Sequence, residues 1–335
     1  MPELFSRLQV KNLDFKNRIV MPPMATERSG PDGLVKEESL AYYEELAGRG
    51  MALLIVEHNC VSAQGMVSPG QMSIASGQTL PGHRRLSQAV RRQDALVALQ
   101  INYAGSNRQE TIPGPCLGAS PVPHPVTGLT PLEMSEKQIA EIIGAFGSAA
   151  ARGKEAGYDL VEIHSAHGYL LSQFLSPLTN QRRDRYGGDP ARRRRLLMEV
   201  IEEVRARVGS DYPLLVRLGV SDTPPGMALH SGGLTLADGV AAAAATAAAG
   251  IDILDISGGL CGSRPAGLSG EAYFLPWLEE IRLAVTLPLL ITGGITRAET
   301  AAAIIAHGRA DLVGIGRALA ADRSWVRRAE TVGTP

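Results

Sequence analysis

Two histidines and a tyrosine share one short segment, Glu162-Ile-His-Ser-Ala-His-Gly-Tyr169. His164 and His167 stand three residues apart, and Tyr169 follows two residues later. Imidazole N–H groups donate hydrogen bonds to a carbonyl oxygen, and a phenol can deliver a proton. The pattern predicts a site that binds a carbonyl oxygen by hydrogen bonds and delivers a proton.

Two other interpretations of the histidine pair were weighed. A zinc site needs a third ligand and usually a fourth, and the sequence offers no clear candidate. The cysteines Cys60, Cys116 and Cys261 lie too far apart for a CxxC metal or iron–sulfur site. We therefore expect no metal. Two packed histidines at a strand end remain an alternative, which their place at the mouth of a long loop disfavours.

Two glycine-rich segments predict a phosphate site. Thr292-Gly-Gly-Ile295 and Gly314-Ile-Gly-Arg317 each end an expected strand, one after the other along the chain. Glycine lets main-chain N–H groups approach phosphate oxygens, and a following helix N-terminus adds a favourable field. The guanidinium of Arg317 can add a charge-assisted bond. We expect Gly294, Gly316 and Arg317 to bind a phosphate.

Two polar residues end further expected strands. The amide of Gln100 offers a donor and an acceptor, which suits the edge of a pyrimidine ring, and the guanidinium of Arg217 can neutralise an anion. Either residue alone could equally be a structural hydrogen-bonding group.

Several functions are disfavoured. The sequence lacks GxGxxG and GxxxxGK[ST], so neither a Rossmann unit nor a P-loop is indicated. Its five lysines avoid the expected strand ends, which argues against a Schiff-base aldolase. The net charge of −1 is spread along the chain and gives no field for nucleic acid. The arginine run at residues 191–195 is interpreted as a solvated helix start.

Short apolar runs alternate with helical segments, which predicts a parallel sheet with crossover helices. Eight such units would close a (β/α)8 TIM barrel, and we expect residues 1–335 to form one domain. The expected strands are Arg18–Met24, Ala52–Glu57, Leu96–Ile101, Leu160–His164, Leu214–Arg217, Ile253–Ile256, Leu289–Thr292 and Leu312–Gly314. An N-terminal β-hairpin over Leu8–Phe15 would cap the barrel. The long loops 102–134 and 165–189 follow strands, where barrels carry their active sites.

The compartment follows from what the sequence lacks. No apolar run reaches the roughly 20 residues of a membrane span, and the N-terminus lacks the pattern of a secretion signal. We expect a cytoplasmic protein without a membrane or nucleic-acid partner.

The sequence resembles the Old Yellow Enzyme family of FMN-dependent ene-reductases over nearly its whole length. The most specific stretch runs from His164-Ser-Ala-His-Gly-Tyr169 to Arg185-Tyr-Gly-Gly188. The segments Asn17–Met24, Ala98–Gln100 and Gly308–Arg317 resemble the family's first strand, its flavin-binding third strand and its phosphate-binding end.

The resemblance implies a role for each candidate residue. Pro23, Met24 and Ala25 would line one side of FMN, the backbone of Cys60 would touch its ring, Gln100 would bond the pyrimidine edge, Arg217 would sit near N1 and O2, and Gly294, Gly316 and Arg317 would hold the phosphate. His164 and His167 would bind the substrate's oxygen, and Tyr169 would protonate its alpha carbon. NAD(P)H would supply hydride, and the substrate would be a small activated alkene.

Two residues depart from the family pattern. Ala25 stands where many relatives place Cys or Thr, which predicts an altered reduction potential, and Tyr103 replaces a common histidine. Iron–sulfur and nucleotide-binding additions of larger relatives are not seen, so electrons would come from a bound nicotinamide or a partner.

Other functions remain open. They are nitroester reduction or oxidative demethylation on an FMN barrel, a catalytically silent flavin-binding barrel, and a phosphosugar isomerase. A homo-oligomer is compatible with the resemblance.

Overall fold

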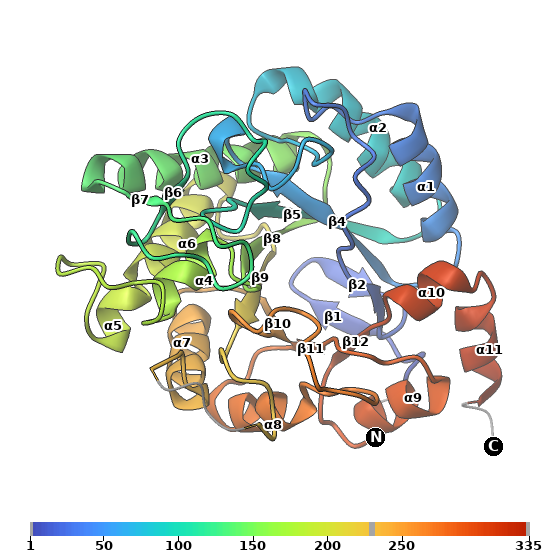
Figure 1. Cartoon of the computed structure of the whole chain (residues 1–335). Coiled ribbons are helices and arrows are strands. Elements are labelled where there is room, and N and C mark those ends of the chain that lie inside the picture. The colour runs from blue at the N-terminus through green and yellow to red at the C-terminus, as the bar shows by residue number, and fades with distance from the viewer. Residues whose placement is uncertain (1–2, 228–231, 333–335) are drawn as a thin grey trace.

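The computed structural model describes residues 3–227 and 232–332. Eight parallel strands close into a TIM barrel, with helices outside it (Figure 1). Around the barrel the strands follow the order β10, β11, β12, β3, β4, β5, β8, β9. Their bounds are β3 Ile19–Met21, β4 Leu53–Cys60, β5 Leu96–Asn102, β8 Leu160–Ser165, β9 Leu214–Gly219, β10 Ile253–Ser257, β11 Leu289–Ile291 and β12 Leu312–Gly314.

All eight expected strands are confirmed, seven of them with shifted ends and Leu312–Gly314 as expected. The first is shorter than expected and stops at Met21, because Pro22 and Pro23 have no N–H to donate to a neighbouring strand. The second runs three residues beyond Glu57 to Cys60, where it meets a bridge to Ser73. The third and fifth strands run on to Asn102 and Gly219, so Gln100 and Arg217 are not the last residues of their strands.

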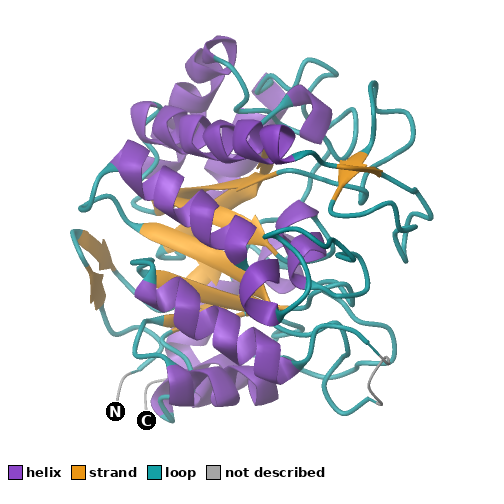
Figure 2. Ribbon diagram, turned by 90° about the vertical axis from the view of Figure 1, so that its left-hand side faces the viewer, coloured by secondary structure: helices purple, strands orange, loops and turns teal. Residues whose placement is uncertain are grey.

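Helices cover the outside of the barrel, and Figure 2 shows them wrapped around the strands. Their apolar faces pack on the outward side chains of the sheet in one large core. The helices are α1 Glu37–Ala47, α2 Leu80–Arg91, α3 Glu136–Glu155, α4 Leu170–Leu175, α5 Pro190–Arg193, α6 Arg195–Val208, α7 Leu236–Ala248, α8 Leu275–Ala284, α9 Ala298–Ala306, α10 Arg317–Ala321 and α11 Trp325–Val332, with two 3-10 turns at Ala63–Gly65 and Gly77–Thr79. None of the helices within the described ranges is long and apolar enough to cross a membrane.

The predicted N-terminal hairpin is confirmed. Strands β1, Leu8–Val10, and β2, Leu13–Phe15, pair antiparallel. Val10, Leu13 and Phe15 are buried in one cluster with inward side chains of the barrel strands. Figure 2 places this hairpin at one end of the barrel and the long loops at the other. The hairpin thus closes the N-terminal end and leaves the C-terminal mouth to the loops.

The interior of the barrel changes from apolar to polar along its axis. On four neighbouring strands, an apolar residue of the hairpin-side cluster is followed two positions later by a buried polar one. Because residues i and i+2 of a strand share a face, the polar set forms a layer above the apolar one. The pairs are Ala98 and Gln100, Leu160 and Glu162, Leu215 and Arg217, and Ile253 and Asp255.

Two segments, the 102–134 loop and the arginine run, differ from their sequence-based description. The 102–134 loop carries two short parallel strands, β6 Leu117–Gly118 and β7 Leu132–Glu133. In the arginine run, the solvated interpretation is wrong for Arg193, which is buried. Its Nε donates to the Leu175 carbonyl at 2.9 Å and its Nη1 to the Gly188 carbonyl at 2.5 Å. Arg193 therefore ties the 165–189 loop to α5.

Candidate active site

A pocket of about 430 Å³ opens at the C-terminal mouth of the barrel. This volume lies within the range of small-molecule sites, roughly 300–1,000 Å³. The pocket is lined by residues at or beyond the strand ends: Pro22, Pro23, Met24, Ala25, His58, Gln100, His164, His167, Tyr169, Arg217, Ser263, Arg264, Tyr273, Thr292, Gly293, Gly294, Ile295, Thr296, Gly314, Gly316, Arg317 and Ala318. All but one of the predicted site residues are among them.

The histidine pair and the tyrosine converge on one end of this pocket. The ring of His164 lies edge-on to His167 at 4.8 Å and to Tyr169 at 4.9 Å between centroids. His167 has a φ of +58°, a left-handed conformation that costs strain in a non-glycine residue. Its N–H donates to the Gly258 carbonyl at 2.9 Å, and the Asn107 amide donates to its carbonyl at 2.9 Å. These two bonds hold His167 in this conformation beside His164.

The three side chains are neutral hydrogen-bonding groups. Burial lowers the pKa of both imidazoles well below 6.5, and the positive charge of Arg217 lowers it further. Burial raises the pKa of Tyr169 to about 12, with a smaller contribution from Glu27.

Contacts with the main chain and with a serine indicate where the imidazole protons lie. The Ala166 N–H donates to Nδ1 of His164 at 3.3 Å, so the proton of this ring is on Nε2. His164 is therefore a neutral Nε2–H donor. In His167 the Nε2 atom is already engaged, because it is bonded to the Ser257 hydroxyl at 2.7 Å.

His58 is a pocket residue that the sequence analysis missed. Its ring stacks on that of Tyr169 at 5.5 Å, and Gln71 Nε2 lies 2.8 Å from its Nδ1. Burial lowers its pKa to about 4, so this ring is also neutral. The sequence could have indicated His58, because it directly follows the expected strand Ala52–Glu57 and active-site residues of a barrel lie at such strand ends.

The two glycine segments come together at the opposite end of the pocket, as predicted. Gly294 has a φ of +72°, and a Cβ there would lie 2.5 Å from the Gly270 carbonyl oxygen, so the position requires glycine. The N–H groups of Gly294 and Gly316 have no acceptor in residues 3–227 and 232–332. Arg317, the first residue of α10, lines the same end. This end therefore offers main-chain donors and a cation.

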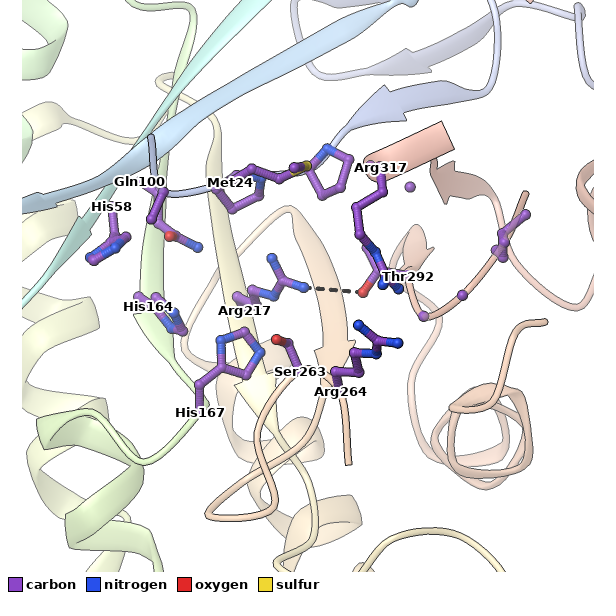
Figure 3. A pocket seen from close by; sticks show the side chains of 18 of the residues that line it. Met24, His58, Gln100, His164, His167, Arg217, Ser263, Arg264, Thr292 and Arg317 are labelled. Carbon is purple, nitrogen blue, oxygen red and sulfur yellow. Dashed lines mark hydrogen bonds between the residues drawn. The ribbon is translucent and has the colours of Figure 1, made fainter. Parts of the chain in front are cut away.

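The loop after β10 also reaches this part of the pocket and was not singled out from the sequence. It contributes Ser263, Arg264 and Tyr273, and the Tyr273 hydroxyl donates to the Ser263 carbonyl at 2.7 Å. Figure 3 shows Arg264 near Thr292 and Arg317, on the side away from the three imidazoles.

One wall of the pocket is formed by the segment after β3. Pro23, Met24 and Ala25 lie there as expected. A Cβ at Gly316 would lie 3.2 Å from the Met24 sulfur, so this wall packs closely against the loop after β12.

The floor of the pocket is the polar layer of the barrel. Arg217 Nη2 donates to the Thr292 hydroxyl at 3.1 Å, and its Nε lies 3.2 Å from Asp255 Oδ2. Gln100 Nε2 donates to Glu162 Oε2 at 2.6 Å. Gln100 and Arg217 are therefore both pocket residues and members of a buried network, as the two interpretations of them allowed.

The structure does not bring Cys60 to the pocket, which corrects its predicted place against the ring. Its N–H donates to the Met72 carbonyl and its carbonyl accepts from the Ile74 N–H, so its main chain is used by the neighbouring segment. Tyr103, noted as a departure from the family pattern, also lies elsewhere, with its ring against Gly65. Among the described residues, no group of three His, Cys, Asp or Glu side chains could hold a metal ion.

Fold and pocket together define a TIM barrel with a two-ended ligand site at its C-terminal mouth. The model of the NADH:flavin oxidoreductase / NADH oxidase family matches residues 3–332. The chain belongs to this family, whose cofactor is FMN, and the resemblance to the Old Yellow Enzyme family is confirmed.

Named relatives support this membership. The chain is 36% identical to an NADPH dehydrogenase of Bacillus subtilis, covering 98% of this chain and 94% of that protein. It is 38% identical to an NADH oxidase of Thermoanaerobacter brockii, covering 98% of this chain but only about half (51%) of that protein. A solved old yellow enzyme homologue from Zymomonas mobilis superposes with a TM-score of 0.86 at 26% identity, covering 99% of this chain and 94% of that one.

The pocket fits FMN by its own chemistry. Unpaired main-chain N–H groups and Arg317 at one end suit a phosphate, and the wall at Met24 offers an apolar face to a ring. The amide of Gln100 and the guanidinium of Arg217 suit the polar edge of that ring.

Proposed function

We propose that this protein reduces activated C=C bonds of α,β-unsaturated carbonyl compounds, with FMN in the described pocket and NAD(P)H as the electron donor. The observation that carries the proposal is the convergence of three neutral groups, His164, His167 and Tyr169, at the pocket end opposite the phosphate loops. Residues 1–335 would act as one FMN-binding unit. The three free cysteines suit a reducing cytoplasm.

In this proposal each end of the pocket holds one part of the cofactor. Gly294, Gly316 and Arg317 hold the phosphate, while Pro23, Met24 and Ala25 line one face of the ring. Gln100 and Arg217 bond its pyrimidine edge. FMN bound there would supply the hydride chemistry that couples oxidation of the nicotinamide to reduction of the alkene.

His164 and His167 bind the carbonyl oxygen of the substrate. As hydride reaches the beta carbon, negative charge builds on that oxygen, and donors that are already oriented stabilise it. In comparable oxyanion sites one such donor is worth about 2.7–4 kcal/mol. Because both rings are buried and neutral, they donate without first losing or gaining a proton.

Tyr169 delivers the proton to the alpha carbon. Its hydroxyl has no hydrogen-bond partner in the described part of the chain, and the side chain lines the pocket. A phenol with a raised pKa is fully protonated at working pH and can transfer its proton to a strongly basic carbon.

The test is steady-state NADPH consumption with 2-cyclohexenone, compared with a nitroester and an N-methyl compound. We expect turnover with the enone and its loss in the double variant His164→Ala/His167→Ala. Turnover confined to the nitroester or N-methyl compound would replace this proposal by another reaction class. Absence of turnover with all three, with FMN bound, would indicate a silent flavin-binding barrel.

A further inference from the structure

Two carboxyl groups are completely buried below the pocket. Glu162 and Asp255 both have 0% of their surface exposed. Only one guanidinium, that of Arg217, faces them from the strand between them, β9. Glu162 Oε1 and both Asp255 carboxyl oxygens have no hydrogen-bond partner in the described residues, although Asp255 Oδ2 forms an ion pair with Arg217 Nε at 3.2 Å. Burial of carboxyl groups with unmet hydrogen bonds costs free energy of folding. Stability alone therefore does not account for these two carboxyl groups at the floor of the pocket.

The direct hydrogen bond of Glu162 goes to a pocket residue. Gln100 Nε2 donates to Glu162 Oε2 at 2.6 Å, between β5 and β8, whose register places the two residues opposite each other. An amide presents its NH2 and its carbonyl in different directions. With the NH2 held by Glu162, the carbonyl Oε1 of Gln100 is directed elsewhere.

The carbonyl oxygen of Gln100 is available at the pocket. No hydrogen bond within the described residues engages Gln100 Oε1, and it is not among the buried atoms without a partner. Since Gln100 lines the pocket, this oxygen is an acceptor presented to whatever binds there. With Glu162 as a carboxylate, or as an acid whose proton lies on Oε1, the reversed amide would place two oxygen acceptors 2.6 Å apart, which disfavours it.

The other charged groups of the floor do not set the orientation of the Gln100 amide. Arg217 uses Nη2 for Thr292 and Nε for Asp255. Burial, with repulsion from Asp255, raises the pKa of Glu162. The proton can reside on Oε1, which has no partner, and Oε2 then accepts from Gln100 in the neutral acid as in the carboxylate.

We propose that Glu162 is a positioning residue, which orients the Gln100 amide so that its carbonyl oxygen faces the ring N–H of the flavin pyrimidine. This inference rests on the proposed placement of FMN. The pyrimidine edge of a flavin carries one N–H donor between two carbonyl oxygens. An oriented acceptor therefore selects this N–H, whereas a freely turning amide would place its own NH2 there part of the time.

The test measures the binding of FMN and of 3-methyl-FMN, which lacks this N–H, to the apoprotein. Glu162→Leu removes the acceptor for Gln100. We expect it to weaken FMN binding about five-fold, the effect of one typical hydrogen bond, and to lower the preference for FMN over 3-methyl-FMN. Glu162→Gln keeps a carbonyl acceptor and should retain that preference. Glu162→Met serves as a second variant without an acceptor if the leucine variant does not fold.

A double-mutant cycle with Gln100→Leu separates positioning from general damage. If Glu162 acts through Gln100, Glu162→Leu has no further effect on FMN binding once Gln100 is leucine. An equal loss of affinity for FMN and 3-methyl-FMN, or a full additional loss in the double variant, would overturn the inference. If Gln100→Leu alone leaves FMN binding unchanged, the placement of FMN is wrong and this inference fails with it.

Discussion

Three side chains at the pocket end are kept neutral by the same cause. Burial disfavours the charged form of any group, so it lowers the pKa of an imidazole and raises that of a phenol. His164, His167 and Tyr169 show these opposite shifts within one cluster. The site therefore holds hydrogen-bond donors of constant charge across the physiological range.

Removal of one proton donor should affect a single half of the reaction. Tyr169→Phe is expected to slow protonation of the substrate about 10²–10⁴-fold, the usual contribution of a positioned acid. Reduction of the flavin by NADPH should stay near wild type, because it needs no phenol. Stopped-flow absorbance of each half-reaction measures both effects. Tyr273→Phe, which removes a hydroxyl that donates to the Ser263 carbonyl, is the matched control, and an equal loss there would contradict the role of Tyr169.

The buried acid under the pocket predicts how stability varies with pH. Burial and repulsion from Asp255 raise the pKa of Glu162 well above its ordinary 4.5 in the folded state. The folded chain therefore keeps a proton that the unfolded chain loses, and stability falls as pH rises from about 4.5 toward the raised pKa. Glu162→Gln cannot ionise and should flatten this part of the profile. Burial also raises the pKa of Asp255, so this group lowers stability with rising pH in wild type and in Glu162→Gln alike.

Urea unfolding of the apoprotein at several pH values measures this effect. Glu280→Gln changes an exposed carboxyl and should keep the wild-type slope. Identical slopes in wild type and Glu162→Gln would contradict a protonated Glu162.

Different strand ends and loops form the two ends of the pocket. The loops after β11 and β12 form the phosphate end, while the end of β8 carries His164 and the loop after β8 carries His167. Active-site residues on a TIM barrel lie at the C-terminal ends of the strands, as they do here.

The phosphate end can be tested with a ligand that lacks the phosphate. Arg317→Ala should weaken FMN binding roughly 10–100-fold, the effect of one hydrogen bond to a charged group, and leave riboflavin binding unchanged. Arg84→Ala, which removes an exposed arginine that does not line the pocket, is the control and should leave both affinities unchanged. Fluorescence titration of the apoprotein measures both ligands. An equal loss of riboflavin affinity would show that Arg317 does not contact the phosphate.

The sequence was informative where local pattern determines structure. The apolar β-branched runs predicted all eight strands, and the short spacing of His164, His167 and Tyr169 predicted a shared site. Glu162 was hidden because nothing local distinguishes a buried carboxyl from an exposed one. His58 and Arg264 were missed because their place depends on the closure of the barrel. Cys60 and Arg193 were misplaced because their partners, Met72 and Leu175, lie in segments whose path the sequence does not reveal.

At the scale of the molecule, stability and chemistry occupy opposite ends of the barrel. The hairpin and the apolar interior close the N-terminal end, and the polar layer lies between them and the pocket. A change at the closed end should alter stability without altering the site.

Phe15→Ala tests this division. Phe15 is fully buried in the hairpin-side cluster, and its truncation should lower the free energy of unfolding by about 3–5 kcal/mol. FMN affinity at temperatures where the variant is folded should be unchanged. Leu283→Ala, at a position 85% exposed, should change stability by less than about 0.5 kcal/mol. Loss of FMN affinity in folded Phe15→Ala would show that the two ends are coupled.

The most direct test of the central claim is the reoxidation of the NADPH-reduced protein by 2-cyclohexenone without oxygen, followed by flavin absorbance. We expect rapid return of the oxidised spectrum in wild type and a slow return in His164→Ala/His167→Ala. A reduced wild-type protein that the enone leaves reduced, and that only oxygen reoxidises, would contradict it.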